Sequence, residues 1–493
     1  MYYNSAVDKT LFSKPVQFLE RHAVKFLVGW ILLLSVLYAT LSIVRHNNFQ
    51  SGGFDLGLYD QTVWQYSRFL YPYNTIKERF ILGDHFTLTL PIISPLLYVW
   101  NNVRVLLVFQ AVWLSISSLA VYLLAMKRRL GTVVSMLLAF LYSTFYGIQF
   151  VVYFDFHPVI IGVGLIAWLA YFFETGRKKL TAITIVLLLL TQENMGIALA
   201  CLGCIYLFRK EYRKTALWFI IGGMLYSIVA SKIIALFSPV GFQYWPQLSF
   251  HPVKILTQFF DSSEKQQVWL YSFAWFSFLP IFSAGALLAV FLDLAQYFVT
   301  GPEFARMWSP FMHHRAILAP FLTLGTLAVL VSLRNRKVSV TAIVVFMVLI
   351  SLAQQYFFHF PLNKLSKAEY WLREPWMDNM NQLIASVPSG VSLATQQNLV
   401  PHVSHRKEIY IAWPRKHDLE SKPCGEVTCW WLDFGGAPQF LLVDTRPNQW
   451  LTQILETNEN WHSAISNMEK TGKITLERSV GDARLYRVHE TEN

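Results

Sequence analysis

The sequence predicts a membrane all-α protein of about 11 transmembrane helices, followed by a small α/β domain on the outer side. Three observations predict this fold class. Of the 493 residues, 54% are hydrophobic and the mean hydropathy is +0.38, which is too apolar for a soluble domain of this length. Apolar stretches of about 20 residues, enough to cross roughly 30 Å of hydrocarbon, recur through the first three quarters of the chain. From residue 365 onwards the apolar runs become short.

The net charge of +11 comes from basic residues that cluster between the apolar stretches. This is the pattern of cytoplasmic loops, so we expect membrane lipids and no nucleic acid as partners. The first 24 residues are polar and basic, and the first span begins near Lys25 without a small-residue cleavage site, which predicts a retained anchor.

The clearest spans are residues 25–44, 103–126, 132–152, 158–175, 215–237, 315–333 and 339–358. Residues 180–208 are apolar but interrupted at Gln192-Glu193-Asn194, and both flanks are basic, which predicts two short helices that meet at the break. Residues 270–298 contain Pro280 and Gly285 and no lysine or arginine, which predicts a hairpin entering from the outside. The membrane domain is then residues 1–364, with a cytoplasmic N-terminus and a large first outer loop at 45–102.

The outer domain, residues 365–493, has strand-like runs at 391–394, 409–412 and 440–443 and candidate helices at 376–386, 449–457 and 461–470. Two further strands, 474–478 and 483–488, flank a Gly481-Asp482 turn and predict a hairpin. Cys424 and Cys429 are a candidate disulfide in an oxidising compartment, whereas Cys201 and Cys204 lie in an apolar stretch and suit helix packing.

Acidic residues stand out in the first loop, because only 14% of the chain is charged. Asp55 and Asp60 lie in the run Gly52-Gly53-Phe54-Asp55-Leu56-Gly57-Leu58-Tyr59-Asp60-Gln61. On a helix they would be about 140° apart, so at most one points into a given pocket. Asp84-His85 ends the same loop. For both sites the alternative is a carboxylate that faces water or caps a helix.

Asp155-Phe156-His157-Pro158 lies at the outer end of the third span. The residue before a proline is pushed to extended geometry, in which i and i+2 point the same way. Asp155 and His157 should therefore project together, a geometry that suits a metal or a phosphate; the alternative is an ion pair that caps the next helix. With Asp84 and His85 they form a candidate set of ligands for a divalent metal such as Mg²⁺ or Mn²⁺.

Gln192 and Glu193 sit at a helix break inside the membrane, where an acid is a functional candidate, although a protonated glutamate bonded to neighbouring helices is the alternative. Arg306, His313, His314 and Arg315 gather before the span at 315–333 and suit a lipid phosphate, or else lie against headgroups. In the expected topology all these clusters face the outer half of the membrane.

The motifs quoted above, together with His313-His314-Arg315, resemble those of a family of uncharacterised multi-spanning prokaryotic membrane proteins. The outer segment from Asn398 to Arg406, Asn-Leu-Val-Pro-His-Val-Ser-His-Arg, resembles that family's C-terminal part. The likeness covers nearly the whole chain. At the helix break the family pattern suggests a lysine before the acid, where this chain has Gln192.

More distantly, the layout is similar to the GT-C glycosyltransferases, which use sugars carried on polyprenyl phosphate. The resemblance implies a catalytic base in the first outer loop, which maps onto Asp55. It also implies a glycan, lipid or protein acceptor and an inverting transfer at the outer face of a bacterial inner membrane, with a periplasmic C-terminal domain. Candidate substrate- or phosphate-binding residues are then Asp60, Gln192, Glu193, Arg306, His313, His314 and Arg315. A lipid or glycan transporter and a non-catalytic envelope assembly protein are the alternatives.

Overall fold

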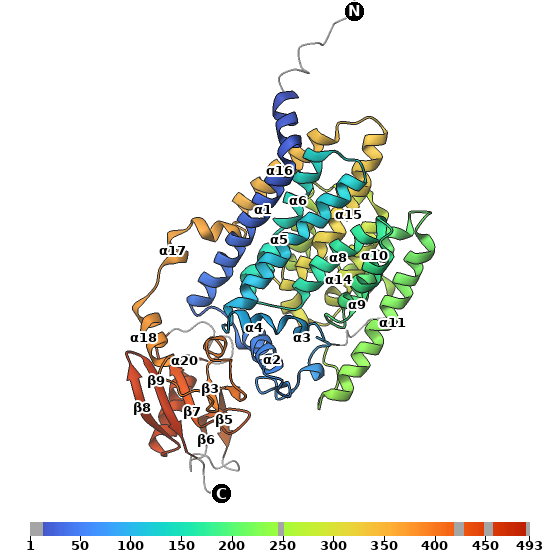
Figure 1. Ribbon diagram of the computed structural model, residues 1–493. Helices are drawn as coiled ribbons and strands as arrows, with labels where there is room; N and C mark the ends of the chain where they lie inside the picture. Colours follow the sequence, from blue (N-terminus) through green and yellow to red (C-terminus); the bar gives the residue numbers. More distant parts are fainter. Residues whose placement is uncertain (1–12, 245–250, 419–427, 448–456, 490–493) are drawn as a thin grey trace, which may run out of the picture.

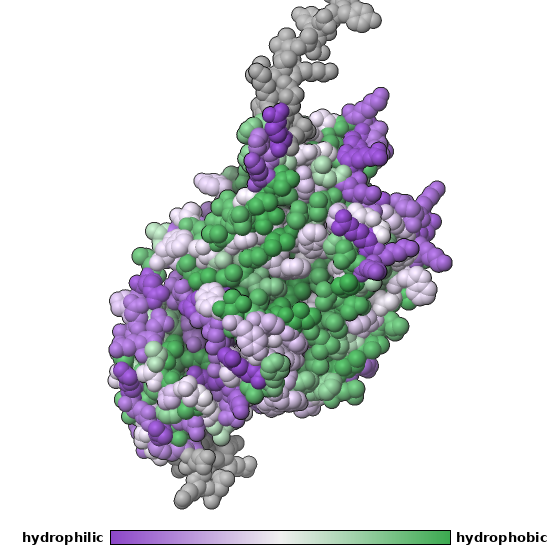
Figure 2. Space-filling view, viewed as in Figure 1, coloured by the Kyte–Doolittle hydropathy of each residue, from purple (hydrophilic) through white to green (hydrophobic). Residues whose placement is uncertain are grey.

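The structure, a computed structural model, describes residues 13–244, 251–418, 428–447 and 457–489. A bundle of helices forms its larger part, and a small sheet lies at the end of the bundle opposite to the start of α1 (Figure 1). Hydrophobic residues form a broad belt over the face of the bundle seen in Figure 2, and hydrophilic residues gather towards its two ends. This is the surface expected of a protein whose flanks face lipid.

The bundle is made of helices that differ widely in length. They are α1 (Ser13–Asn47), α5 (Arg104–Lys127), α6 (Thr132–Ser143), α7 (Tyr146–Phe154), α8 (Val159–Glu174), α9 (Lys178–Leu189), α10 (Met195–Leu207), α11 (Arg213–Phe237), α13 (Ser263–Ala274), α14 (Ala284–Phe298), α15 (Leu318–Asn335) and α16 (Val340–Phe357).

The prediction of 11 spans is wrong for the part of the chain that the structure describes. Five helical stretches there are long and apolar enough to cross a membrane, or six if the bent pair α6 and α7, which meet at 41°, counts as one span. The helices α8, α10 and α14 are apolar but only 16, 13 and 15 residues long. The predicted span at 158–175 is the 16-residue α8, and the two predicted hairpins contain the short helices α10 and α14, so the number of apolar stretches overstates the number of crossings.

The predicted break between 180 and 208 is confirmed, because α9 ends at Leu189 and α10 begins at Met195. After the break, α10 packs backbone to backbone on α11. A Cβ atom added to Gly196 would lie 2.3 Å from the Gly223 carbonyl oxygen, and one added to Gly223 would lie 2.2 Å from the Gly196 oxygen. Both positions therefore exclude a side chain.

A buried carboxylate joins several helices at the end of the bundle away from the sheet. Glu174, at the end of α8, accepts hydrogen bonds from Arg128 at 2.5 Å and from the Tyr206 hydroxyl at 2.9 Å. Arg209 forms a further ion pair with it at 2.9 Å. The basic clusters that follow α5 and α10 thus lie together at one end of the bundle.

The first loop is folded rather than extended. It contains a π-helix, η1 (Gly53–Gly57), then α2 (Leu58–Ser67), a short hairpin of β1 (Tyr73–Asn74) and β2 (Arg79–Phe80), the 3-10 turn η2 (Ile81–Gly83), α3 (Leu90–Ile93) and α4 (Leu96–Val99). After α16 the chain reaches the sheet through α17 (Ala368–Trp371) and α18 (Pro375–Ile384).

The C-terminal sheet has the strand order β4-β3-β7-β9-β8. The strand β3 (Leu393–Thr395) is parallel to β4 (Ile409–Ile411) and β7 (Phe440–Asp444), and β9 (Ala483–Val488) is antiparallel to β7 and β8 (Ile474–Val480). A separate hairpin joins β5 (Trp413–Asp418) to β6 (Thr428–Asp433), and α20 (Asn458–Lys470) buries Trp461 against the sheet.

The three predicted strands, the hairpin at Gly481-Asp482 and the helices near 376–386 and 461–470 are therefore confirmed. The sequence missed β5 and β6. The predicted helix at 449–457 falls outside the described residues except for Thr457, and so does Cys424, the expected disulfide partner of Cys429.

Two glycines of the first loop lie against the C-terminal part of the chain. A Cβ atom on Gly57 would come within 2.6 Å of a methyl carbon of Val400, in the turn η7 (Val400–His402), and one on Gly53 would lie 3.2 Å from the Gln397 carbonyl oxygen. The glycine spacing in the first loop thus allows the C-terminal domain to dock.

We predict that Gly57→Ala destabilises this contact by about 1–3 kcal/mol, because the added methyl group overpacks against Val400. The measurement is thermal unfolding of the purified protein in detergent. The double variant Gly57→Ala/Val400→Ala should recover much of the loss. Gly222→Ala is the control, because nothing lies within 4 Å of a Cβ there. If Gly222→Ala and Gly57→Ala lost stability to a similar extent, the contact between Gly57 and Val400 would not explain the loss.

Candidate functional site

The Asp155 carboxylate ties the start of the first loop to the bundle. It accepts hydrogen bonds of 2.8 Å from Arg45, in the last turn of α1, and of 2.8 Å from the Gly52 backbone N–H. The side chains of Arg45 and Asp155 are 11% and 3% exposed, so the ion pair is shielded from water. The path of the chain into η1 is therefore fixed by a charged pair between α1 and the residue after α7.

His157 does not share these partners, although the backbone at Asp155 is extended as predicted. Its Nε2 atom lies 3.2 Å from the Tyr59 hydroxyl, and its ring stacks on His313 with centroids 4.0 Å apart. Burial and the neighbouring His85 lower the pKa of His157 to about 3, although Asp84 acts in the opposite direction. His157 is therefore a neutral imidazole, and the expectation that it acts jointly with Asp155 is not supported.

Asp55 differs from the other acids of the cluster. Its side chain lies in η1 and is half-buried, and among the described residues no hydrogen bond or ion pair to its carboxylate is found. Burial and the Asp155 carboxylate raise the pKa of Asp55 to about 7, while Lys77, Arg45 and Arg306 act in the opposite direction. A partly accessible carboxylate with a pKa near neutrality can accept a proton.

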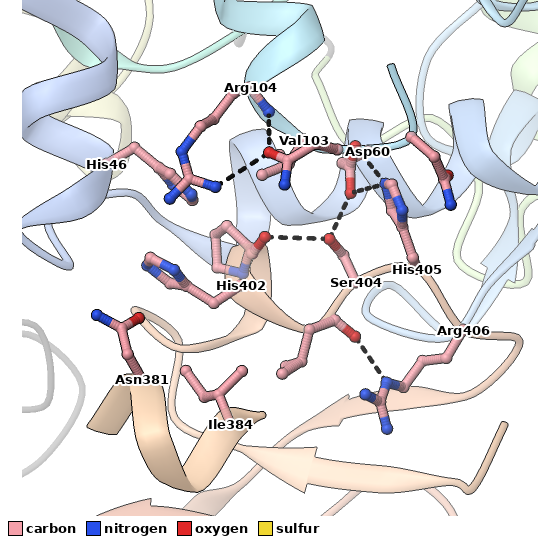
Figure 3. Close-up of a pocket in the computed structure, with 14 residues that line it drawn as sticks. His46, Asp60, Val103, Arg104, Asn381, Ile384, His402, Ser404, His405 and Arg406 are labelled. Carbon is pink, nitrogen blue, oxygen red and sulfur yellow. Dashed lines mark hydrogen bonds and ion pairs between the residues drawn. The ribbon is translucent and has the colours of Figure 1, made fainter. Parts of the chain in front are cut away.

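Asp60 faces the C-terminal domain instead (Figure 3). It is 0% exposed, accepts a hydrogen bond of 2.5 Å from the Ser404 hydroxyl and lies 3.0 Å from the His405 Nε2 atom. Asp55 and Asp60 therefore have different neighbours, as their spacing predicts. The contacts of Asp60 make it a docking residue between the first loop and the segment 398–406.

The end of the first loop is bound to the helix break. The His85 Nδ1 atom lies 2.8 Å from one Glu193 oxygen, and the Phe86 backbone N–H donates to the other at 3.1 Å. The Gln192 amide nitrogen is 3.2 Å from the same His85 atom. Asp84 forms an ion pair with Lys77 at 3.5 Å. Glu193 thus anchors the loop to the break between α9 and α10.

The residues before α15 divide into buried and exposed members. Arg315 is 0% exposed and donates to the main-chain oxygens of Met307 and, at 3.3 Å, Ser309. His313 stacks on His157 and is tilted against His314, with ring centroids 4.0 Å apart in each pair. Arg306 is exposed in the turn η4 (Pro302–Trp308). Of the predicted phosphate ligands here, only Arg306 presents its charge to solvent.

The four residues expected to hold a metal do not converge on one point. Asp155 pairs with Arg45, His85 with Glu193, and Asp84 with Lys77, so three of the four already have partners within the protein. Over the described ranges, no group of three or more histidine, cysteine, aspartate or glutamate side chains is placed to hold a metal ion. The donor set therefore does not fit a divalent metal, and we assign no metal-dependent step to it.

Several residues of the site carried no signal in the sequence. Arg45 and Lys77 supply positive charge near Asp55, Tyr59 bonds His157, and Tyr244 donates to Asp84 at 3.3 Å. None of these side chains stands out from its sequence neighbours, so only the folded structure shows that it belongs to the site. His405 is different, because it lies in the outer segment that carries the family resemblance.

A helical bundle with a hydrophobic belt, and a polar cluster at the end that carries the sheet, defines a multi-pass membrane protein. Residues 45–453 match the family of predicted membrane proteins described as DUF2079, a domain of unknown function, and the chain belongs to that family. A comparison with curated proteins finds no match.

We predict that stability depends on pH through His405. Burial alone would lower the pKa of His405, but the Asp60 carboxylate and its hydrogen bond outweigh burial and raise it. The protonated ring therefore stabilises the fold fully below the ordinary histidine pKa of about 6.5, and this stabilisation is lost as pH rises through the raised value. This loss of stability is measured by thermal unfolding between about pH 5 and pH 9, a range that includes the ordinary histidine pKa.

His405→Gln should flatten the pH dependence of the melting temperature. His489→Gln is the control, because this histidine is exposed after β9. An unchanged pH profile in His405→Gln would show that the Asp60 contact does not titrate in this range.

Proposed function

We propose that this protein is a membrane glycosyltransferase that transfers a sugar from a polyprenyl-phosphate donor to an acceptor hydroxyl. One observation carries the proposal: Asp55 is the acid of the cluster whose carboxylate is left without a partner in the described chain, and its pKa is about 7. Asp155, Glu193 and Asp60 are engaged by Arg45, His85 and His405 respectively. The free carboxylate has the properties of a general base.

The chemistry requires only this base and a suitable donor. The acceptor oxygen attacks the anomeric carbon while its proton passes to Asp55. The bond between the anomeric carbon and the phosphate oxygen breaks, and its electron pair leaves with the polyprenyl phosphate. Since the base and the leaving group lie on opposite faces of the sugar, the configuration at the anomeric carbon is inverted.

The leaving phosphate needs positive charge, which lowers the energy of the transition state. Lys77 and Arg306 both influence Asp55 electrostatically, and Arg306 is exposed at the same end of the bundle. We assign the phosphate to these two cations. Arg315 was the sequence-based candidate, but its guanidinium is bound to main-chain oxygens, so its contribution is to hold the turn that carries Arg306.

The location follows from the charge pattern and rests on the same proposal. The basic clusters near Arg128 and Arg209 support a cytoplasmic position for that end of the bundle, and we propose that Asp55 and the sheet face the periplasm of a bacterium. A lipid-linked sugar in the outer leaflet reaches this side, whereas a cytoplasmic nucleotide sugar does not. The large first outer loop and helical bundle are the features shared with the GT-C enzymes.

We predict that Asp55→Asn lowers transfer about 10²–10⁴-fold, the usual contribution of a general base. Transfer is measured with purified protein and labelled polyprenyl-phosphate sugars. In the unsubstituted protein, kcat/KM should rise with pH through about 7, because the ionised carboxylate is the active form. Asp378→Asn, a matched change at a side chain that is 72% exposed, should keep full activity.

If Asp55→Asn transferred the sugar at the rate of the unsubstituted protein, Asp55 would not be the general base. Movement of the labelled lipid across proteoliposomes without any transfer would support the transporter instead. The transfer is also expected to persist in EDTA, since the four residues Asp84, His85, Asp155 and His157 do not form a metal site.

A further inference from the structure

A polar cavity lies between the first loop and the C-terminal domain (Figure 3). Its volume is about 320 Å³. The end of α1, the start of α5, α18 and the segment 401–406 all contribute to its walls. Asp55 is not among its lining residues, so it is distinct from the proposed transfer site.

The walls carry positive charge that is not neutralised. Arg104 donates to the side-chain oxygens of Asn47, at 2.6 Å, and Asn102, at 3.0 Å. Arg406 donates to the main-chain oxygens of Val403, at 2.6 Å, and Val391, at 3.3 Å. Over the described chain, neither guanidinium forms an ion pair.

The carboxylate of the lining, Asp60, does not offset both cations, because Ser404 and His405 already occupy it. An anion in the cavity would therefore meet two guanidinium groups whose other ligands are all uncharged oxygens. Arginine in such a setting favours phosphate and carboxylate groups.

Two histidines supply the second observation. The rings of His46 and His402 stack with centroids 4.2 Å apart, and both residues line the cavity. His46 is 0% exposed, and the Nε2 atoms of both rings are buried without a hydrogen-bond partner in the part of the chain that the structure describes. Burial and Arg104 lower the pKa of His402 to about 3, so its ring is neutral and can donate one N–H.

Buried polar groups are nearly always hydrogen-bonded, so two buried ring nitrogens without a partner among the described residues call for a further polar partner such as a water or a ligand. We propose that this cavity binds a phosphate group, held by Arg104, Arg406 and the two imidazoles. Asn101 and Asn102, which precede α5, also line the cavity. A lipid headgroup and a soluble phosphate ester both present the phosphate group that this lining would bind.

The binding test uses full-length protein in neutral detergent and is independent of transfer activity. Methyl phosphate is titrated by calorimetry and should bind and raise the melting temperature. Arg104→Gln should weaken binding at least tenfold. Arg336→Gln removes the same charge at an exposed position and should bind as the unsubstituted protein does. No binding of methyl phosphate, or equal loss in both variants, would overturn the proposal.

His402→Phe is the second variant, in case Arg104→Gln does not fold. It keeps the ring that stacks on Phe49, with centroids 4.2 Å apart, but removes the N–H, and it should also weaken binding. To distinguish a lipid headgroup from a soluble phosphate ester, the melting temperature is measured again in nanodiscs of phosphatidylcholine with and without phosphatidylglycerol. Stabilisation by phosphatidylglycerol that Arg104→Gln abolishes identifies a lipid; stabilisation by methyl phosphate alone identifies a soluble ester. If neither phosphatidylglycerol nor methyl phosphate stabilises the protein, the proposal of a phosphate site is overturned.

Discussion

The buried Asp155 carboxylate is the contact on which the polar end of the molecule depends. It joins α1, through Arg45, to the residue that follows α7, and it also binds the Gly52 N–H. A charge in such a position is tolerated only while it is paired, so the loop that begins at Gly52 has one entry geometry. After burial, the same carboxylate is the next cause of the raised pKa of Asp55, so the group that fixes the start of the loop also favours the protonated form of the candidate base.

The first loop is held at two further points, and these explain its composition. On one side Asp60 binds Ser404 and His405, and the bare backbone of Gly57 makes room for Val400. At its other end His85 binds Glu193 at the helix break. Before the Asp60 anchor, directly after Gly52, the chain forms the short π-helix η1, a conformation that is often associated with functional sites. The loop is thus a rigid connector between the bundle and the sheet.

Much of this arrangement could be predicted from residue patterns. The alternation and turn chemistry of the C-terminal part give β3, β4, β7 and the β8–β9 hairpin, and the Gln192-Glu193-Asn194 interruption gives the break between α9 and α10. The number of spans could not be obtained, because an apolar stretch does not show whether its helix crosses the membrane, and α8, α10 and α14 are apolar helices of only 16, 13 and 15 residues.

The site was predictable to the extent that it consists of clustered polar residues in apolar surroundings. Asp55, Asp84, His85, Asp155 and Glu193 stand out for that reason. The partner of each could not be predicted, because an ion pair such as Arg45–Asp155 joins residues 110 positions apart and leaves no local pattern. Hence the sequence treated Asp84, His85, Asp155 and His157 as one set of ligands, whereas the fold gives most of them separate partners.

The first loop carries two carboxylates whose surroundings act in opposite directions. Burial would raise the pKa of Asp84, but His85, Lys77 and Arg79 outweigh it and lower the pKa overall. Burial and the Asp155 carboxylate raise the pKa of Asp55 to about 7, because the opposing charges of Lys77, Arg45 and Arg306 act without a direct hydrogen bond to it in the described chain. Structural carboxylates are held ionised by direct partners, while a base must keep its lone pairs for substrate. By this criterion Asp84 belongs to the framework of the loop and Asp55 to its chemistry.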